Sequence, residues 1–90
     1  MQSIQFTVTA AEGIHARPAT MLVSASAAFA STIKLIFNGN RSNLKSILAV
    51  MSLGIPADAD VAIEINGADE DAAKEKLVST IASLELGNIQ

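Results

Sequence analysis

The chain contains short segments in which every second residue is apolar. Such alternation over residues 4–8, 33–37 and 61–65 predicts three half-buried strands. Asn38-Gly39 is a strong signal for a tight turn, so we expect the polar residues 40–43 to pair back as a modest strand. Together these segments predict a sheet of four strands with one buried and one solvated face.

Other segments carry apolar residues at the helical spacing of three and four. Residues 16–29 place small and apolar side chains on one face and leave Met21 pointing away from it. Residues 47–53 are short and almost wholly apolar, with Ser46 as a good N-cap and Gly54 as a good C-cap. A helix this apolar cannot be covered on one side only, so we expect part of it to be exposed.

A third helix is expected to begin after Asp69, which serves as its cap, and to end at Gly87. The order of elements is then strand, helix, strand, strand, helix, strand, helix. This order predicts one α+β domain over residues 1–90, with three helices packed on one face of a four-stranded antiparallel sheet.

Composition excludes several classes of function. The chain has no cysteine and only one histidine, so we predict no disulfide, no metal site and no cofactor. With three Phe and neither Trp nor Tyr, it lacks stacking platforms for nucleic acid. No signal peptide is recognisable, and no apolar run approaches the roughly 20 residues of a membrane span. We therefore expect a soluble, cytoplasmic protein that neither binds nucleic acid directly nor enters a membrane.

The net charge of −3 is unevenly distributed. Up to Gly54 the cations outnumber the single acid Glu12, whereas the remainder of the chain is clearly acidic. A basic region on an acidic protein favours an acidic partner or an anionic ligand.

The only histidine, His15, lies one residue ahead of the first predicted helix. A helix N-terminus has unpaired N–H groups and partial positive charge, which favour a neighbouring anion and disfavour a proton on the imidazole. Pro18 suits the first turn, the amides of Ala16 and Arg17 stay free for a phosphate, and the Arg17 side chain can add a charge-assisted contact. A neutral imidazole is a nucleophile, so this arrangement suits a histidine that accepts a phosphoryl group.

Two motifs carry a family resemblance. Residues 13–20 read Gly-Ile-His-Ala-Arg-Pro-Ala-Thr, and residues 43–47 read Asn-Leu-Lys-Ser-Ile, followed by Val-Met-Ser-Leu-Gly at 50–54. They resemble the active-site and regulatory-serine signatures of the HPr family, the histidine-containing phosphocarrier proteins of the bacterial phosphoenolpyruvate:sugar phosphotransferase system. The resemblance covers nearly the whole chain and implies an open-faced sandwich of four antiparallel strands and three helices.

The resemblance also implies roles for single residues. His15 would be phosphorylated on Nδ1 by Enzyme I, which uses phosphoenolpyruvate, and would pass the group to EIIA domains of sugar permeases. Ser46 resembles the site of an ATP-dependent HPr kinase/phosphorylase, and its phosphorylated form would resemble the corepressor of a catabolite-control transcription factor. The chain would then be a monomeric carrier rather than an enzyme.

The exposed apolar residues predict where partners dock. We expect a patch from Met21, Ile47 and Met51, extended by Thr20 and Leu48, beside His15. A phosphate on Ser46 would add a charge of about −2 next to this patch and repel an acidic partner.

Some positions depart from the common family pattern. Ser24, Ala27 and Ala28 stand where relatives often carry lysines, and Leu48-Ala49 stands where Met-Gly is usual.

Three other functions are compatible with parts of the sequence: a regulatory paralogue acting through phosphoserine, a nitrogen-related carrier, and a small interaction module with an incidental histidine. The presence of His15 opposes the first, and the intact Ser46 motif is not required by the second. Replacement of His15 by Ala would separate out the third.

Overall fold

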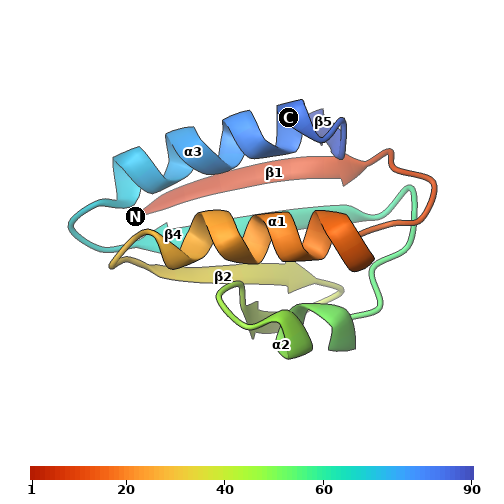
Figure 1. Cartoon of the computed structure of the whole chain (residues 1–90), viewed down its shortest axis with the longest axis horizontal. Helices are drawn as coiled ribbons and strands as arrows, with labels where there is room; N and C mark the ends of the chain where they lie inside the picture. Colours follow the sequence, from red (N-terminus) through yellow and green to blue (C-terminus); the bar gives the residue numbers. More distant parts are fainter.

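The computed structural model describes all residues from 1 to 90. Five strands and three helices follow one another along the chain (Figure 1). The order is β1 (Gln2–Val8), α1 (Ala16–Ala27), β2 (Thr32–Phe37), β3 (Asn40–Asn43), α2 (Ile47–Ser52), β4 (Asp60–Asn66), α3 (Glu70–Ser83) and β5 (Gly87–Ile89).

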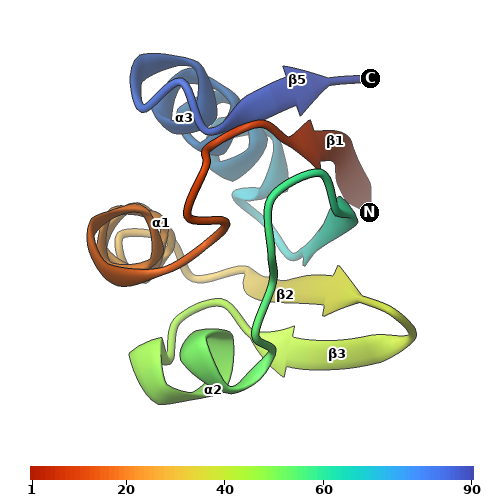
Figure 2. The same cartoon turned by 90° about the vertical axis from the view of Figure 1, so that its right-hand side faces the viewer.

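The strands form a single antiparallel sheet in the order β3-β2-β4-β1-β5. Figure 2 shows the three helices on one side of this sheet and the other side open. The predicted α+β open-faced sandwich is confirmed, but the prediction of four strands is wrong, because the sheet has five.

The additional strand is β5, which pairs with the outer edge of β1. Gly87 lies opposite Val8, and the Gln90 amide extends the pairing by donating to the Gln5 carbonyl at 2.7 Å. A Cβ at Gly87 would lie 2.4 Å from the Thr7 carbonyl oxygen, so a glycine allows this close approach. The prediction that Gly87 ends the last helix is wrong, since α3 ends at Ser83 and Gly87 begins a strand.

The core lies between the sheet and the helices and follows the predicted alternation. In β1 and β4 every second side chain is buried, from Ile4 to Val8 and from Val61 to Ile65. On α1 the buried residues are Ala19, Leu22, Ala25 and Ser26, and on α3 they are Ala73, Leu77, Thr80 and Ile81. The helix α1 ends at Ala27, two residues before the predicted end, and the partly buried Phe29 packs on the core from the following loop.

Two local predictions concern chain reversals and caps. Asn38 and Gly39 both have positive φ, 54° and 81°, as a tight β-hairpin turn requires, so the Asn-Gly prediction is confirmed. Asp69 does occupy the N-cap position of α3, but its side chain makes no capping hydrogen bond. Its carboxylate instead accepts hydrogen bonds from the Ala30 amide, the Ser31 amide and the Ser31 hydroxyl, tying the start of α3 to the loop before β2.

None of the helices combines the length and the apolar character that crossing a membrane would require.

Candidate functional site

A tightly held loop delivers His15 to the start of α1. Gly13 adopts φ +70° and its amide donates to the Ala10 carbonyl at 3.0 Å. The next residue, Ile14, is buried, and its amide donates to the Ile55 carbonyl at 3.1 Å. Because both residues before it are fixed, His15 is held in one backbone position while its side chain remains exposed.

His15 is the N-cap residue of α1, with extended backbone angles of φ −147° and ψ 158°. Its side chain makes no capping hydrogen bond, so the imidazole is free to react. The following Ala16 has φ +49°, a left-handed conformation that costs a residue with a Cβ about 1 kcal/mol. Pro18 has no N–H, and the amides of Ala16 and Arg17 belong to the first turn, which has no intrahelical acceptors for them. A phosphoryl group on His15 would therefore meet unpaired donors.

The Arg17 side chain lines a groove of about 360 Å³ between α1 and α3, together with Met21, Lys76 and Leu84. No hydrogen bond joins the guanidinium to His15 in this structure. The sequence shows that an arginine is close to His15 but not which side of α1 it lies on.

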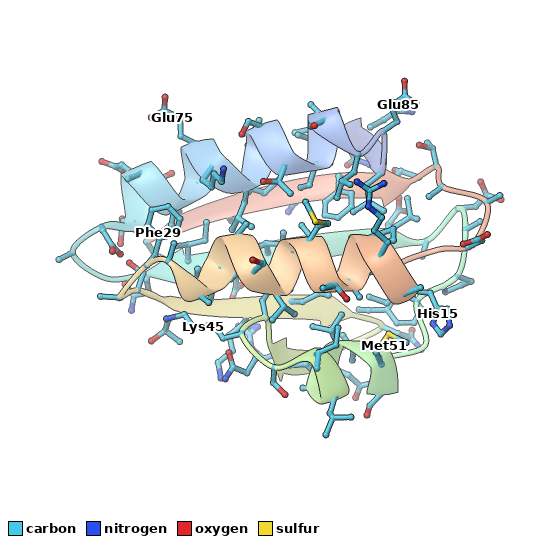
Figure 3. The ribbon with its side chains drawn as sticks, viewed as in Figure 1. His15, Phe29, Lys45, Met51, Glu75 and Glu85 are labelled. Carbon is cyan, nitrogen blue, oxygen red and sulfur yellow. The ribbon has the colours of Figure 1, made fainter.

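The apolar residues predicted as a docking patch lie on two sides of α1. Ile47 and Leu48, which are 38% and 78% exposed, share α2 with the half-buried Met51. Figure 3 shows Met51 and His15 at the same end of the molecule. Met21, 39% exposed, instead faces α3, since it lines the groove that contains Arg17. Thus α2 presents a compact apolar surface, and Met21 belongs to a separate one.

Thr20 is exposed on α1, and its hydroxyl donates to the Ala16 carbonyl at 3.1 Å. This bond occupies the proton of the hydroxyl and leaves its methyl group and lone pairs for a partner.

Ser46 caps α2 as the sequence predicts, with its hydroxyl accepting a hydrogen bond from the Ala49 amide at 3.3 Å. The preceding loop is anchored to the loop after α1 by Lys45, whose ammonium donates to the Phe29 carbonyl at 2.7 Å. Ser46 is half-buried, at the start of the helix that carries Ile47 and Leu48. A charge added to its hydroxyl would therefore lie beside the apolar surface of α2.

Clear electrostatic perturbations occur at the other end of the fold, around the start of α3. Hydrogen bonds from the Ser31 hydroxyl and then the Ala30 amide lower the pKa of Asp69. The terminal ammonium of Met1, 2.9 Å away, and then the Gly67 amide lower the pKa of Glu70. These carboxylates tie the start of α3 to neighbouring segments, and the start of α3 lies at the opposite end of the molecule from the start of α1 (Figure 1).

No three acidic or histidine side chains converge to form a candidate metal site. Sequence reasoning missed the groove between α1 and α3 and the residue Lys76 within it. The spacing of Lys76, Thr80 and Ser83 places them on one face of α3, but only the packed structure shows that this face meets Arg17.

Comparison with known proteins places these features in a family. The family model described as the PTS HPr component phosphorylation site matches residues 2–83. A histidine-containing phosphocarrier protein of Mycoplasma superposes with a TM-score of 0.94 at 32% identity, covering 97% of this chain and 99% of its own. HPr of Thermoanaerobacter tengcongensis superposes with a TM-score of 0.87 at 34% identity, covering 92% and 93%. The Bacillus subtilis catabolite repression protein Crh, a domain-swapped intertwined dimer, gives 0.70 at 35% identity, covering 80% and 83%.

The matched range, residues 2–83, contains the loop that presents His15 and the cap of α2. A family model spanning nearly the whole chain and close structural relatives above 30% identity lead to one conclusion. The chain belongs to the HPr family of phosphocarrier proteins of the phosphotransferase system.

Proposed function

We propose that the chain carries phosphoryl groups in a sugar phosphotransferase relay, taking them from Enzyme I and passing them to EIIA domains. The observation that supports this most strongly is the exposed, uncapped imidazole of His15 at the N-cap of α1, inside the segment matched by the family model. In the loading step a ring nitrogen bonds to phosphorus while the bond from phosphorus to the donor breaks. The neutral imidazole needs no catalytic base, because the nitrogen supplies the electron pair itself.

The surroundings of His15 are suited to holding the group without trapping it. The unpaired amides of Ala16 and Arg17 offer hydrogen bonds to phosphate oxygens. The Arg17 guanidinium can add a charge-assisted contact to the same oxygens. Because the imidazole lies at the surface, a partner can approach the phosphorus in line from solvent.

We assign docking of Enzyme I and EIIA to the apolar surface of α2, formed by Ile47, Leu48 and Met51, with Thr20 at its edge. Exposed apolar residues beside a reactive group are typical of protein interfaces. Met21 then serves only a partner that also reaches over α1 toward α3.

We further propose that Ser46 is the site of an ATP-dependent HPr kinase/phosphorylase. Phosphoserine at a helix N-terminus is stabilised by the same amides that the hydroxyl now caps. The added charge of about −2 beside Leu48 would repel an acidic Enzyme I and create a new surface for a catabolite-control transcription factor.

The carrier is expected to be a monomer in the cytoplasm. The outer edge of β1 is paired with β5, and its inner edge is paired with β4. Both edges of this strand are thus occupied within one chain, so β1 offers no free edge for pairing with a second copy.

A relay reconstituted with labelled phosphoenolpyruvate, Enzyme I, this chain and an EIIA domain tests the proposal. Label should reach EIIA only when the chain is present, and the His15→Ala variant should stop the transfer. Transfer to EIIA that is equally fast with the His15→Ala variant would contradict the carrier role.

A further inference from the structure

The groove between α1 and α3 has the volume of a small-molecule site. Its volume of about 360 Å³ lies in the range of ligand pockets, which begins near 300 Å³. The α1 wall contributes Arg17 and Met21, and the α3 wall contributes Lys76 and Ser83, with Leu84 directly after the helix. Figure 1 shows the two helices running side by side on the covered face of the sheet.

The groove is positively charged although the protein is acidic overall. Two of the six cations, Arg17 and Lys76, line it, and none of the nine acidic residues does. Glu75 on α3 and Glu85, which follows the end of that helix, both project away from α1 (Figure 3). A local excess of two positive charges, in a chain with a net charge of −3, favours an anion at this place over the rest of the surface.

The two charged side chains in the groove form no ion pair within the protein. Neither Arg17 nor Lys76 takes part in a salt bridge, since the ion pairs of the structure join Met1 to Glu70 and Arg41 to Glu64.

The hydroxyls of the groove differ in what they can offer. Ser79 and Thr80 donate to the Lys76 carbonyl, at 3.0 Å and 2.7 Å, so their protons are already used. The Ser83 hydroxyl donates to no protein group. The guanidinium, the ammonium and one hydroxyl thus remain as donors from two opposing walls.

We propose that the groove between α1 and α3 binds a small phosphate monoester. A dianion with several terminal oxygens can accept from the Arg17 guanidinium, the Lys76 ammonium and the Ser83 hydroxyl at once. The half-buried Leu84 and the exposed Met21 supply apolar surface for the organic part of the molecule.

Binding would also have a consequence for His15, and this consequence rests on the proposed carrier function. A monoester bound to Arg17 in the groove would compete with the phosphoryl group on His15 for the same guanidinium. Occupancy of the groove would then slow loading of the carrier.

The test is a titration of the ¹⁵N-labelled chain with glycerol 3-phosphate, with glycerol and inorganic phosphate as separate arms. The amide signals of Arg17, Met21 and Lys76–Leu84 should shift and saturate with the monoester, and glycerol should shift none of them. The Lys76→Gln variant should raise the dissociation constant for glycerol 3-phosphate by about tenfold or more, which is the usual effect of removing a charged hydrogen-bond donor.

The matched control is Lys74→Gln, which removes the same charge from the same helix outside the groove, where Lys74 lines a different depression with Gln2. This variant should bind within about twofold of the wild type, because long-range surface charge is largely screened by salt. Equal weakening by both variants, or inorganic phosphate binding as tightly as the monoester, would overturn the proposal. Signal changes confined to the residues around His15 would overturn it as well. None of these readouts uses phosphoryl transfer, so the groove and the carrier function succeed or fail separately.

Discussion

Replacement of Gly13 by Ala tests how the loop before α1 positions His15. A Cβ at Gly13 would lie 2.0 Å from the Ile55 carbonyl oxygen and 2.9 Å from backbone atoms of Pro56. Backbone atoms cannot rotate away as a side-chain end can, so the loop itself must move. The Ile55 carbonyl is also the acceptor of the buried Ile14 amide, and its displacement breaks that bond.

The cost has three parts. A left-handed φ in a residue with a Cβ costs about 1 kcal/mol, the lost hydrogen bond about 1 kcal/mol, and the steric displacement about 1 kcal/mol or more. The sum of about 3 kcal/mol corresponds to a fall in Tm of about 12–24 °C for a domain of this size. Loading of His15 by Enzyme I should also slow, since the residue that carries the imidazole moves with the loop.

Gly39→Ala provides the matched control. Gly39 has φ +81°, but an added Cβ would meet nothing within 4 Å, so only the left-handed φ is penalised. This variant should lose about 1 kcal/mol and about 4–8 °C in Tm, with no effect on loading. Thermal unfolding by circular dichroism measures the stabilities, and loading is compared at a temperature where all variants are folded. Equal losses of Tm at the two glycines would show that the contact with Ile55 contributes nothing to stability.

Three further predictions concern other parts of the site and the fold. Ser46→Ala removes the cap of α2 and should lower stability by about 1 kcal/mol, whereas Ser52→Ala, on the same helix but away from the cap, should change it by less than about 0.5 kcal/mol in chemical denaturation. Leu48→Asp should leave stability within about 0.5 kcal/mol, because this side chain is 78% exposed, yet slow loading by Enzyme I about tenfold in a stopped phosphorylation assay. Asp69→Asn should destabilise the fold most at neutral pH, because the hydrogen bond from the Ser31 hydroxyl lowers the pKa of Asp69. The ionised carboxylate therefore contributes to folding stability above the ordinary aspartate pKa. This contribution is lost as pH falls through the lowered value.

Each of these has a contradicting outcome. An equal loss of stability in the two serine variants would remove the capping role of Ser46. Unchanged loading of Leu48→Asp by Enzyme I would exclude α2 as its docking surface. A difference in unfolding free energy between wild type and Asp69→Asn that stays constant from neutral pH into acid would show that the carboxylate charge plays no part.

Local patterns in the sequence were sufficient for most of the fold. Alternation identifies β1 and β4 because each has one buried face, and the Asn38-Gly39 turn is fixed by conformations that few other residues adopt. The strand β5 could not be found in this way. It has only three residues and no alternation, and its conformation depends on pairing with β1, about eighty residues earlier in the chain.

The same limit applies to the site. The chemistry of His15 and the cap at Ser46 are local, so motif and spacing predict them. The orientation of Arg17 and Met21 toward α3, and the attachment of Asp69 to the loop at Ser31, depend on how elements pack. The spacing of residues along a helix shows which of them share a face. Which other element that face contacts depends on the tertiary packing.

The mass of the intact protein shows whether His15 itself carries the phosphoryl group. The chain is incubated with phosphoenolpyruvate, Mg²⁺ and Enzyme I, and its mass is recorded before and after mild acid. We expect a single acid-labile phosphoryl group that is absent from the His15→Ala variant. A phosphoryl group that survives acid, or one that persists in His15→Ala, would place the modification on another residue and contradict the account.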